Sequence, residues 1–394
     1  MNATAAPRRQ HVVMLLLNPY TNDSRVEREA TSLHDAGYRV TILAVADEAL
    51  PTNEVRDGVS VRRVERPRWP PLVRFVVHRR RVARALRRLR PDVIHAHDTE
   101  TLDVAGSVGR ALGVPIVYDG HELWLERVRR DRSALYWALT RWYYGRVERR
   151  YLPLASAWIT VSAPIARHLE RTYGLDEVAV VPNYPDLAAS AAPRDLRSLP
   201  GAEGIDADAP LVLYVGNATA GRGLEQLVAA MARIPDAHLA LLGAAGHPEL
   251  VWREARRRGV EARVHVLPPV PSDEVVAYAA SATVGVSPVP PTSLSYRYSL
   301  PNKLFQYMQA GLPVVASDFP QVREVIEATG AGITVDARNV DALADAIRTY
   351  TEDAERRSTD GGRGREAVRE RFNWSTAEAS LLEIYRRVSR GRAG

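Results

Sequence analysis

Lys303 is the residue whose position most strongly suggests chemistry. It is the only lysine among 53 Lys and Arg residues, and it stands in the stretch SLPNKLFQYMQAGLPVVASD. Pro301 suits the first position of a helix and Gly311 its end, and the apolar run that follows predicts a buried strand. A cation in the first turn opposes the helix dipole, so a bound phosphate explains it best. The alternative is a solvated charge on an exposed helix end.

A second candidate for phosphate binding is the stretch LYVGNATAGRGLEQL, which predicts a strand, a glycine loop and a helix start. Gly216, Gly221 and Gly223 allow the backbone to approach a ligand closely. Arg222 can hold phosphate oxygens with its fork of N–H donors. The loop matches neither GxxxxGK[ST] nor GxGxxG, and many glycine loops only turn the chain. Together with Lys303, however, it predicts a diphosphate held between two cations.

Histidines and carboxylates follow two short predicted strands in the first half of the chain. PDVIHAHDTETL places His97 and Asp98 after one strand, and VPIVYDGHELW places His121 and Glu122 after the next. The carboxyl ends of parallel strands meet at one edge of a sheet, where ligands bind. A loop histidine there can donate to a ligand hydroxyl or carry a proton, and a neighbouring acid can fix its tautomer.

The segment NPYTNDSRVEREATSLHDAGY follows the first predicted strand. Its helix is expected to be capped near Asn22 or Asp23 and to end at Gly37. Helix capping alone explains Asp23 as well as ligand binding does. At this edge of the sheet we expect four residues to face a cleft: Asn18, Asp23, Ser24 and Arg25.

No metal site is predicted. His95 and His97 point to one side of an extended segment and His121 follows later, but the sequence next to them supplies no third ligand. The chain has no cysteine, so we expect neither a disulfide nor a thiolate zinc site.

The elements that position these residues are expected to be parallel strands wrapped by helices. The strands are continuous apolar runs, which indicates burial on both faces. A stretch rich in Ala, Ser, Pro and Gly at 185–210 predicts a domain boundary. We therefore expect an α/β fold with two domains, 1–190 and 191–371, and a C-terminal amphipathic helix at 372–394 that packs back onto the first. The strands are expected at 12–17, 40–45, 93–95, 116–118, 158–161 and 178–181, and then at 211–215, 238–242, 264–266, 283–286, 313–316 and 332–335.

Composition excludes several classes of protein. At 394 residues with 46% hydrophobic and 25% charged residues, the chain is typical of soluble globular proteins. No apolar run reaches the roughly 20 residues that a membrane span needs. The first apolar run, of about seven residues, predicts a core strand and not a signal peptide. We expect a cytoplasmic protein.

Charge is concentrated in the first half. Residues 1–190 hold 29 arginines against 22 acidic residues, whereas the rest of the chain is close to neutral. The densest run, Arg62–Arg90, is amphipathic. It predicts peripheral contact with the inner face of an anionic membrane, contact with an anionic acceptor, or a solvated helix face. Nucleic acid is not an expected partner, because no recognised binding module is present.

Across nearly its whole length the sequence resembles the retaining glycosyltransferases of family 4, which have the GT-B fold of two Rossmann-like domains. The likeness lies in DSRVEREATSL, DVIHAHDTETL, VYDGHEL, ITVSAPIARHL, VAVVPNYPD, VGNATAGRGLEQL and, most specifically, SLPNKLFQYMQAGLPVVAS. The resemblance implies that His121 lies beside the donor sugar and that Arg222 contacts the diphosphate. It makes 1–190 the acceptor-binding domain, with His97, Asp98 and Glu122 on the acceptor side, and 191–371 the donor-binding domain. It places Lys303 in the nucleotide-binding turn, together with Ser299, Leu300, Pro301, Asn302 and Gln306.

Two positions depart from the family pattern. Many members carry paired glutamates eight positions apart, of which the second holds the ribose, where this chain has Tyr298 and Gln306. Gln306 can accept a hydrogen bond but brings no charge. A common loop arginine is replaced by Asn217. Diphosphate binding would therefore depend on Arg222, Lys303 and backbone amides.

The resemblance implies metal-independent transfer of a sugar, with no cofactor, from a nucleotide-diphosphate donor, UDP- or GDP-linked, to an acceptor hydroxyl in the cleft between the domains. Polysaccharide or glycolipid assembly is the expected context, and decoration of a secondary metabolite is the alternative. A sugar-nucleotide epimerase on the same fold and a non-catalytic partner derived from a transferase also stay open.

Overall fold

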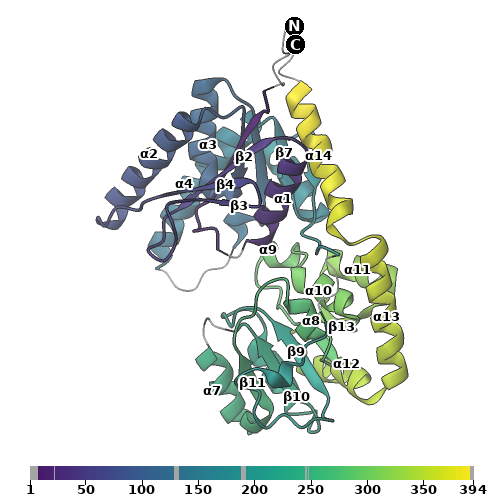
Figure 1. Ribbon diagram of the computed structural model, residues 1–394. Helices are drawn as coiled ribbons and strands as arrows, with labels where there is room; N and C mark the ends of the chain where they lie inside the picture. The colour runs from purple at the N-terminus through teal and green to yellow at the C-terminus, as the bar shows by residue number, and fades with distance from the viewer. Residues whose placement is uncertain are drawn as a thin grey trace. The chain divides into compact units, whose positions relative to one another are not determined.

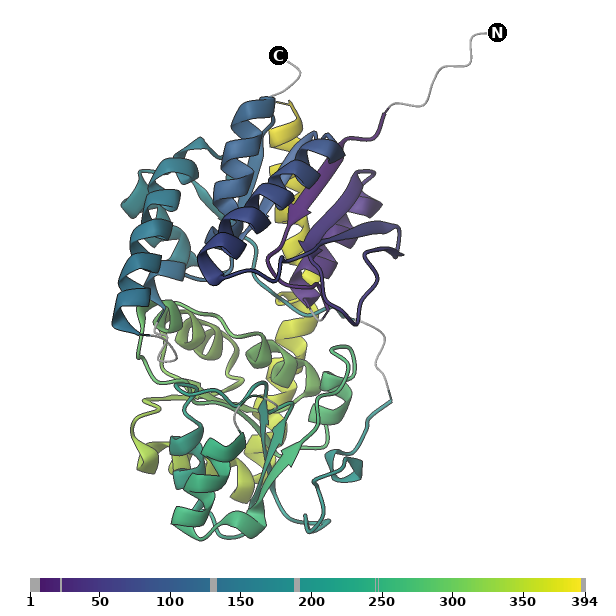
Figure 2. The same cartoon turned by 90° about the vertical axis from the view of Figure 1, so that its left-hand side faces the viewer.

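The computed structural model describes residues 8–21, 23–127, 133–187, 192–244, 246 and 248–390. The chain divides into two compact units. Unit 1 comprises Met1–Pro182 and Ala377–Gly394, and unit 2 comprises Asn183–Thr376. The division thus falls at Pro182, ahead of the predicted boundary at 190, and the C-terminal segment of unit 1 begins at Ala377. Figure 1 shows the helices and strands of both units, and Figure 2 shows them from the side.

Unit 1 is built on an eight-stranded sheet with the order β3-β4-β2-β1-β5-β6-β7-β8. Neighbouring strands run parallel except for the antiparallel pair β3 and β4. The strands are β1 His11–Leu15, β2 Arg39–Val45, β3 Asn53–Arg56, β4 Val59–Val64, β5 Val93–His97, β6 Ile116–Gly120, β7 Ala157–Thr160 and β8 Val178–Val180. The helices are α1 Ser24–Asp35, α2 Pro71–Leu89, α3 Asp98–Leu112, α4 Ala134–Tyr151, α5 Ala163–Tyr173 and α14 Trp374–Arg390.

Alternation along the strands gives this sheet two unlike faces. Ile94 and Ala96 of β5 belong to an apolar core with side chains of α2, α3 and α4. The intervening His95 and His97 lie on the opposite face, where His95 Nδ1 contacts the hydroxyl of Tyr385 on α14 at 2.8 Å. Both faces of the strand are therefore buried, but only one of them is apolar. The other face carries the titratable residues.

Unit 2 is a six-stranded parallel sheet with the order β11-β10-β9-β12-β13-β14. Two apolar cores cover its faces, one with α8, α10, α11 and α13 and the other with α6, α7 and α12. The strands are β9 Leu211–Val215, β10 His238–Leu242, β11 Val264–Leu267, β12 Val284–Ser287, β13 Val314–Ser317 and β14 Gly332–Val335. The helices are α6 Leu224–Met231, α7 Pro248–Arg258, α8 Val275–Ala279, α9 Leu294–Arg297, α10 Asn302–Ala310, α11 Pro320–Thr329, α12 Val340–Glu352 and α13 Ala354–Glu370.

Each sheet has a point where the strand order reverses. In unit 1 the chain leaves β1 for β2 on one side and later places β5 on the other, and in unit 2 the same holds for β9 with β10 and β12. Loops diverge at such a switch point and leave a crevice at the carboxyl ends of the strands. The candidate residues of both halves follow these strand ends.

The structure differs from the expected elements in one region of unit 1. Arg62–Arg90 is not one segment, because its start belongs to β4 and α2 begins only at Pro71. β3 and β4, which were not predicted, form a hairpin across Asp57 and Gly58, both at positive φ. An Asp-Gly turn of this kind is a strong hairpin signal in a sequence. Of the two predicted caps of α1, Asp23 is the cap, and Asn22 lies outside the described residues.

Candidate active site

In unit 2, the loop after β9 and the start of α10 are held together by Tyr307. Its hydroxyl oxygen accepts a hydrogen bond from Val215 N at 2.8 Å and donates to Val286 O at 3.2 Å. The phenol is buried and belongs to α10, so it fixes this helix against β9 and β12. Lys303, at the second position of α10, is thereby brought to the loop of Gly216.

Lys303 and Arg222 form a cationic site at these loops. Lys303 Nζ lies 3.6 Å from the centre of the Tyr214 ring, and Arg222 Cζ lies 5.2 Å from that of Tyr296. Within the part of unit 2 that the structure describes, no carboxylate is recorded in an ion pair with either cation. Burial, and next the charge of Arg222, hold the pKa of Lys303 well below its usual value. An anion bound here would favour the charged form of Lys303 and so offset both effects on its pKa.

Backbone geometry keeps this loop open to a ligand. Gly223 has φ +76°, and a Cβ built on it would lie 1.7 Å from the carbonyl oxygen of Pro288. Gly216 has φ +117°, and the first atom that its Cβ would meet is Lys303 Nζ at 3.6 Å. Glycine at 223 is therefore required by packing, whereas at 216 it leaves the space beside the lysine free.

The other predicted residues of the nucleotide-binding turn differ in exposure. Pro301 caps α10 and does not start it, since the helix begins at Asn302. Ser299 Oγ donates to Tyr296 O at 2.7 Å, so its hydroxyl already has a partner within the turn. Gln306 follows Lys303 by three positions and is partly buried on the same side of α10. Asn302 and Asn217 are exposed, Gly221 is partly buried and Leu300 is buried.

In unit 1, His121 follows β6 and lies between two carboxylates. Its backbone N donates to Asp98 Oδ1 at 2.9 Å, its Nδ1 is 3.4 Å from Asp98 Oδ2, and its Nε2 is 3.1 Å from Asp119 Oδ2. Burial opposes a charge on the ring, but attraction by Asp98 and Asp119 outweighs it and raises the pKa to about 10. His121 is therefore an imidazolium at neutral pH. Its side chain is 24% exposed, and the contact at Nδ1 is longer than a usual N–H···O hydrogen bond, so this N–H can be shared with a ligand.

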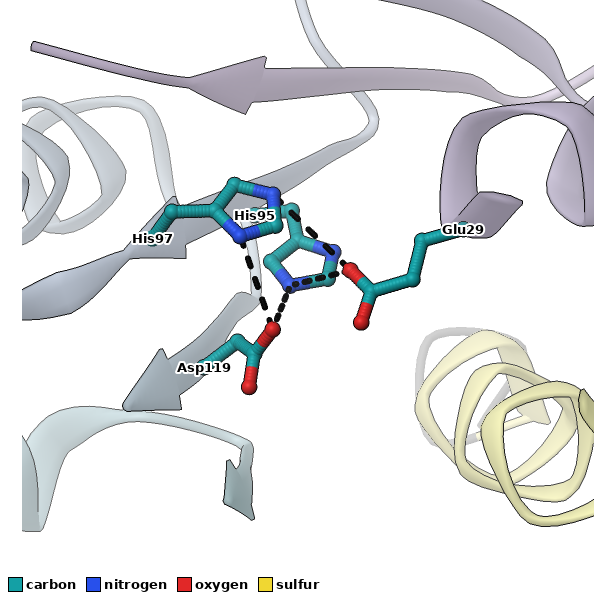
Figure 3. Close-up of side chains that lie close together, drawn as sticks. All are labelled: Glu29, His95, His97 and Asp119. Carbon is teal, nitrogen blue, oxygen red and sulfur yellow. Dashed lines mark ion pairs between the residues drawn. The ribbon is translucent and has the colours of Figure 1, made fainter. Parts of the chain in front are cut away.

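Behind His121 lies a buried cluster on the polar face of the sheet. Figure 3 shows Glu29 of α1 facing His95 and His97 of β5 and Asp119 of β6. The two imidazoles are stacked with ring centres 4.3 Å apart, and His97 Nδ1 is 3.2 Å from His121 Nε2. Burial lowers the pKa of both His95 and His97, so each is neutral at pH 7.

Arg25 corrects one prediction, because it does not face a cleft. The side chain is buried, its Nε and Nη2 donate to the two oxygens of Asp119 at 3.0 and 2.9 Å, and Nη2 also lies 3.0 Å from Glu29. A third donor, Nη1, reaches Val181 O at 2.7 Å. Arg25 therefore neutralises the cluster from within. His97, predicted on the acceptor side, is likewise buried.

The same four side chains supply the donor types of a metal site, since their nitrogen and carboxylate oxygen atoms lie within 4.8 Å of one another. Two observations favour a proton-sharing cluster instead. The ring planes of His95 and His97 are within 13° of parallel, so their in-plane lone pairs do not converge. Arg25 also pairs with both carboxylates, and its permanent positive charge would repel a metal ion at the same place.

The remaining predicted residues of unit 1 have local partners. Asp23 accepts from Val26 N as the cap of α1, and Asn18 Nδ2 donates to Asp23 Oδ2 at 3.1 Å. Ser24 is the first residue of α1. Glu122 pairs with Arg127, so the prediction that this neighbouring acid fixes His121 is wrong. Asp119 and Asp98 hold the imidazole instead.

Sequence reasoning missed three members of the cluster: Glu29, Asp119 and Tyr385. A signal was available for Asp119, since a carboxylate inside the apolar run IVYDG needs a buried partner. Asp98 was predicted at this edge of the sheet, and its φ of +59° marks a strained position of the kind found at functional sites.

The chain is similar to known proteins over most of its length. Residues 24–189 match the model of Glycosyltransferase Family 4, and residues 209–353 match that of Glycosyl transferases group 1. The alpha-maltose-1-phosphate synthase of Mycolicibacterium smegmatis is 31% identical over 75% of this chain and 79% of its own. The phosphatidyl-myo-inositol mannosyltransferase of the same species is 26% identical over 94% of this chain and 92% of its own.

Solved structures share the fold. The sucrose-phosphate synthase of Thermosynechococcus elongatus has a TM-score of 0.81 at 22% identity, over 97% of this chain and all of that one. HepE of Anabaena, solved with UDP-glucose, has a TM-score of 0.75 at 18% identity, over 96% of this chain and 99% of its own. With two Rossmann-like halves, both family models and a relative above 30% identity, the chain belongs to the glycosyltransferases of family 4 with the GT-B fold.

Proposed function

We propose that this glycosyltransferase moves a sugar from a nucleotide-diphosphate donor to an acceptor hydroxyl with retention of anomeric configuration. The observation that carries the donor class is the pair Lys303 and Arg222. Two cations without a recorded acidic partner, one of them at a helix N-terminus, form a site for a multiply charged anion. UDP- and GDP-sugars are the leading candidates, and the HepE complex with UDP-glucose supports the first of these.

The chemical barrier in such a transfer is departure of the diphosphate from a sugar centre that gains oxocarbenium character. Fixed positive charge beside the leaving oxygens lowers this barrier more than a strong base would. In our scheme Lys303 and Arg222 supply that charge, so no metal ion is assigned a role. His121, as an imidazolium, donates a hydrogen bond to the sugar and does not act as a base.

For the acceptor we propose a glycolipid or a cell-surface polysaccharide. Relatives named for phosphatidyl-myo-inositol and inositol-phosphate glycosylation support this context. The acceptor residues would be those at the carboxyl edge of the unit 1 sheet, Asn18, Asp23 and Asp98. In the part of the chain that the structure describes, no helix is long and apolar enough to cross a bilayer.

We also propose that unit 1 binds the surface of an anionic membrane. The first turns of α2 expose Leu72 and Val76, and α4 exposes Leu139 and Trp142. The two helices meet where the Phe75 and Tyr143 rings pack edge to face at 5.4 Å. Farther along α2, a cavity of about 730 Å³ is lined by arginines with no recorded ion-pair partner among the described residues, namely Arg80, Arg84, Arg87 and Arg88. Apolar side chains beside clustered cations are what an anionic lipid surface binds.

The donor site is tested by Lys303→Ala and Arg222→Ala. Each should lower kcat/KM for transfer by about 100-fold or more, because a fixed charge on the leaving group is lost. Arg256→Ala, an exposed arginine of α7 in the same unit, is the matched control. A thermal-shift panel of UDP-, GDP- and dTDP-sugars, run beforehand, selects the donor. Near-normal rates in both variants would refute the assignment.

A further inference from the structure

Glu29 is a buried carboxyl group that no step of the proposed transfer uses. Arg25 Nη2 lies 3.0 Å from its Oε1, and the Nε2 atoms of His95 and His97 lie 3.9 and 4.0 Å from its Oε2. Both oxygens thus face nitrogen atoms that can carry protons. The guanidinium is a permanent donor, whereas each imidazole can place its proton on either nitrogen.

The contact between His97 and His121 decides where the proton of His97 must lie. His121 is an imidazolium held by Asp98 and Asp119, so its Nε2 carries a proton. A second N–H facing it across the 3.2 Å to His97 Nδ1 would leave two donors opposed. His97 Nδ1 is therefore the acceptor, and the one proton of this neutral ring is on Nε2, toward Glu29.

His95 follows the same pattern. Its Nε2 is 3.9 Å from both Glu29 Oε2 and Asp119 Oδ2, and a lone pair aimed at two carboxyl oxygens would be repelled. With the proton on Nε2, Nδ1 is free to accept from the Tyr385 hydroxyl at 2.8 Å. The two imidazoles thus turn their N–H groups toward Glu29 and their lone pairs toward His121 and Tyr385.

From this geometry we infer that Glu29 is a positioning residue for His121. In its ionised form, Glu29 keeps the proton of His97 on Nε2, so that Nδ1 stays an acceptor for the His121 imidazolium. The inference rests on the proposed function only where it assigns His121 to the sugar. One contact opposes it, because Asp119 Oδ2 lies 3.5 Å from His97 Nδ1 and favours a proton on that nitrogen. The tautomer of His97 therefore shows which of the two carboxylates, Glu29 or Asp119, controls the position of its proton.

Replacement of Glu29 by glutamine keeps the shape of the side chain but supplies only one acceptor oxygen. Arg25 cannot give up its donors, so the amide oxygen is expected to face Arg25 and the amide N–H groups to face the imidazoles. His97 must then accept at Nε2, and its proton moves to Nδ1, against His121. The position of one proton in the imidazole ring is thus predicted to change.

The experiment is nitrogen-15 NMR of the full-length protein labelled at histidine, at pH 9 and without substrate. At this pH Glu29, with a pKa of about 8, is ionised, whereas His121, with a pKa of about 10, is still protonated. His97→Gln assigns the His97 signals. The wild-type protein should show His97 with its proton on Nε2 and His121 protonated on both nitrogens, and Glu29→Gln should move the His97 proton to Nδ1. The control is Glu27→Gln, an exposed glutamate on the same helix, which should leave every imidazole signal in place.

A wild-type His97 protonated on Nδ1 at pH 9, or a His121 that is neutral at that pH, would overturn the inference even if Glu29→Gln did not fold. In transfer assays at pH 9, Glu29→Gln should lower kcat by about 10- to 100-fold with an unchanged Kd for the donor, as expected when a reacting group is misplaced. Wild-type protein inactive with every donor would refute the proposed function, while the NMR result would still test the positioning.

Discussion

At the scale of single residues, Arg25 and Lys303 differ in whether an anionic partner lies beside the cation. Arg25 is buried with two carboxylates and a carbonyl, so its interactions are satisfied inside unit 1. Lys303 is partly buried, and the charge nearest to it is that of another cation, Arg222. The sequence predicted the second case, since a single lysine at a helix start is conspicuous, but not the first. Nothing local to Arg25 indicates that Asp119, far along the chain, lies beside it.

His121 makes a prediction about the dependence of stability on pH. Its pKa is raised from 6.5 to about 10 in the folded chain, so folding holds this proton more tightly than the unfolded state does. The stabilisation is complete below pH 6.5 and is lost as pH rises through 10, at up to about 1.4 kcal/mol per pH unit for one proton. His121→Gln should therefore destabilise unit 1 most near pH 6, and the difference from wild type should shrink toward pH 10.

Urea unfolding followed by tryptophan fluorescence measures this difference, since five of the seven tryptophans lie in unit 1. Glu29 also has a raised pKa, of about 8, because of its burial, and it lowers stability over the rise from pH 4.5 to 8 in both proteins. The charge of His121 lowers the pKa of Glu29, so this titration differs between the two proteins. The comparison is therefore made in a Glu29→Gln background, where the titration is absent from both. A difference that stays constant from pH 6 to 10 would show that His121 is not held as a cation.

At the scale of elements, the apolar runs of the sequence located the strands but not their polar contacts. All six expected strands of each unit are present, because a continuous apolar run of this length needs burial on both faces. The hairpin of β3 and β4, which was not predicted, lacks such a continuous apolar run. β3 alternates between exposed and partly buried residues, and β4 alternates between buried and more accessible ones. β4 includes Arg63, which is buried against Glu54 and the carbonyl oxygens of Pro19 and Pro51.

The glycine loop of unit 2 yields a prediction at this scale. In Gly223→Ala the new Cβ would lie 1.7 Å from the carbonyl oxygen of Pro288, and φ is +76°, so the loop after β9 must shift away from β12. Donor affinity should fall by about tenfold or more, since Arg222 moves with the loop. Isothermal titration calorimetry with the selected nucleotide sugar measures this loss.

Gly362→Ala provides the matched control for this prediction. Gly362 lies within α13, and a Cβ there would meet no atom within 4 Å. The helix should gain up to about 1 kcal/mol of stability while donor affinity stays at the wild-type level. Equal donor affinity in the two glycine variants would mean that the loop does not form the donor site.

At the scale of the whole molecule, the unequal distribution of charge accompanies the two kinds of site. The diphosphate site proposed for unit 2 would need only the local pair of cations, and this half of the chain is close to neutral. The first half carries the excess of arginine, and much of it lies on α2. The sequence showed this excess but not the second helix, α4, because the pairing of two exposed apolar faces depends on tertiary packing. The surface of α2 and α4 is therefore a feature of the folded unit.

This surface predicts binding to anionic vesicles. Wild-type protein should sediment with vesicles that contain phosphatidylglycerol more than with phosphatidylcholine alone, and salt should weaken binding by screening the arginines. Arg84→Ala with Arg88→Ala should weaken it about 30-fold, at roughly 1 kcal/mol per charge. Leu72→Ser with Leu139→Ser should weaken binding at every salt concentration, because apolar contact is not screened. Leu154→Ser, an exposed leucine elsewhere in unit 1, should bind as wild type does. Equal binding to both vesicle types would exclude an anionic lipid surface as the partner of α2, and the arginines would then be a solvated face.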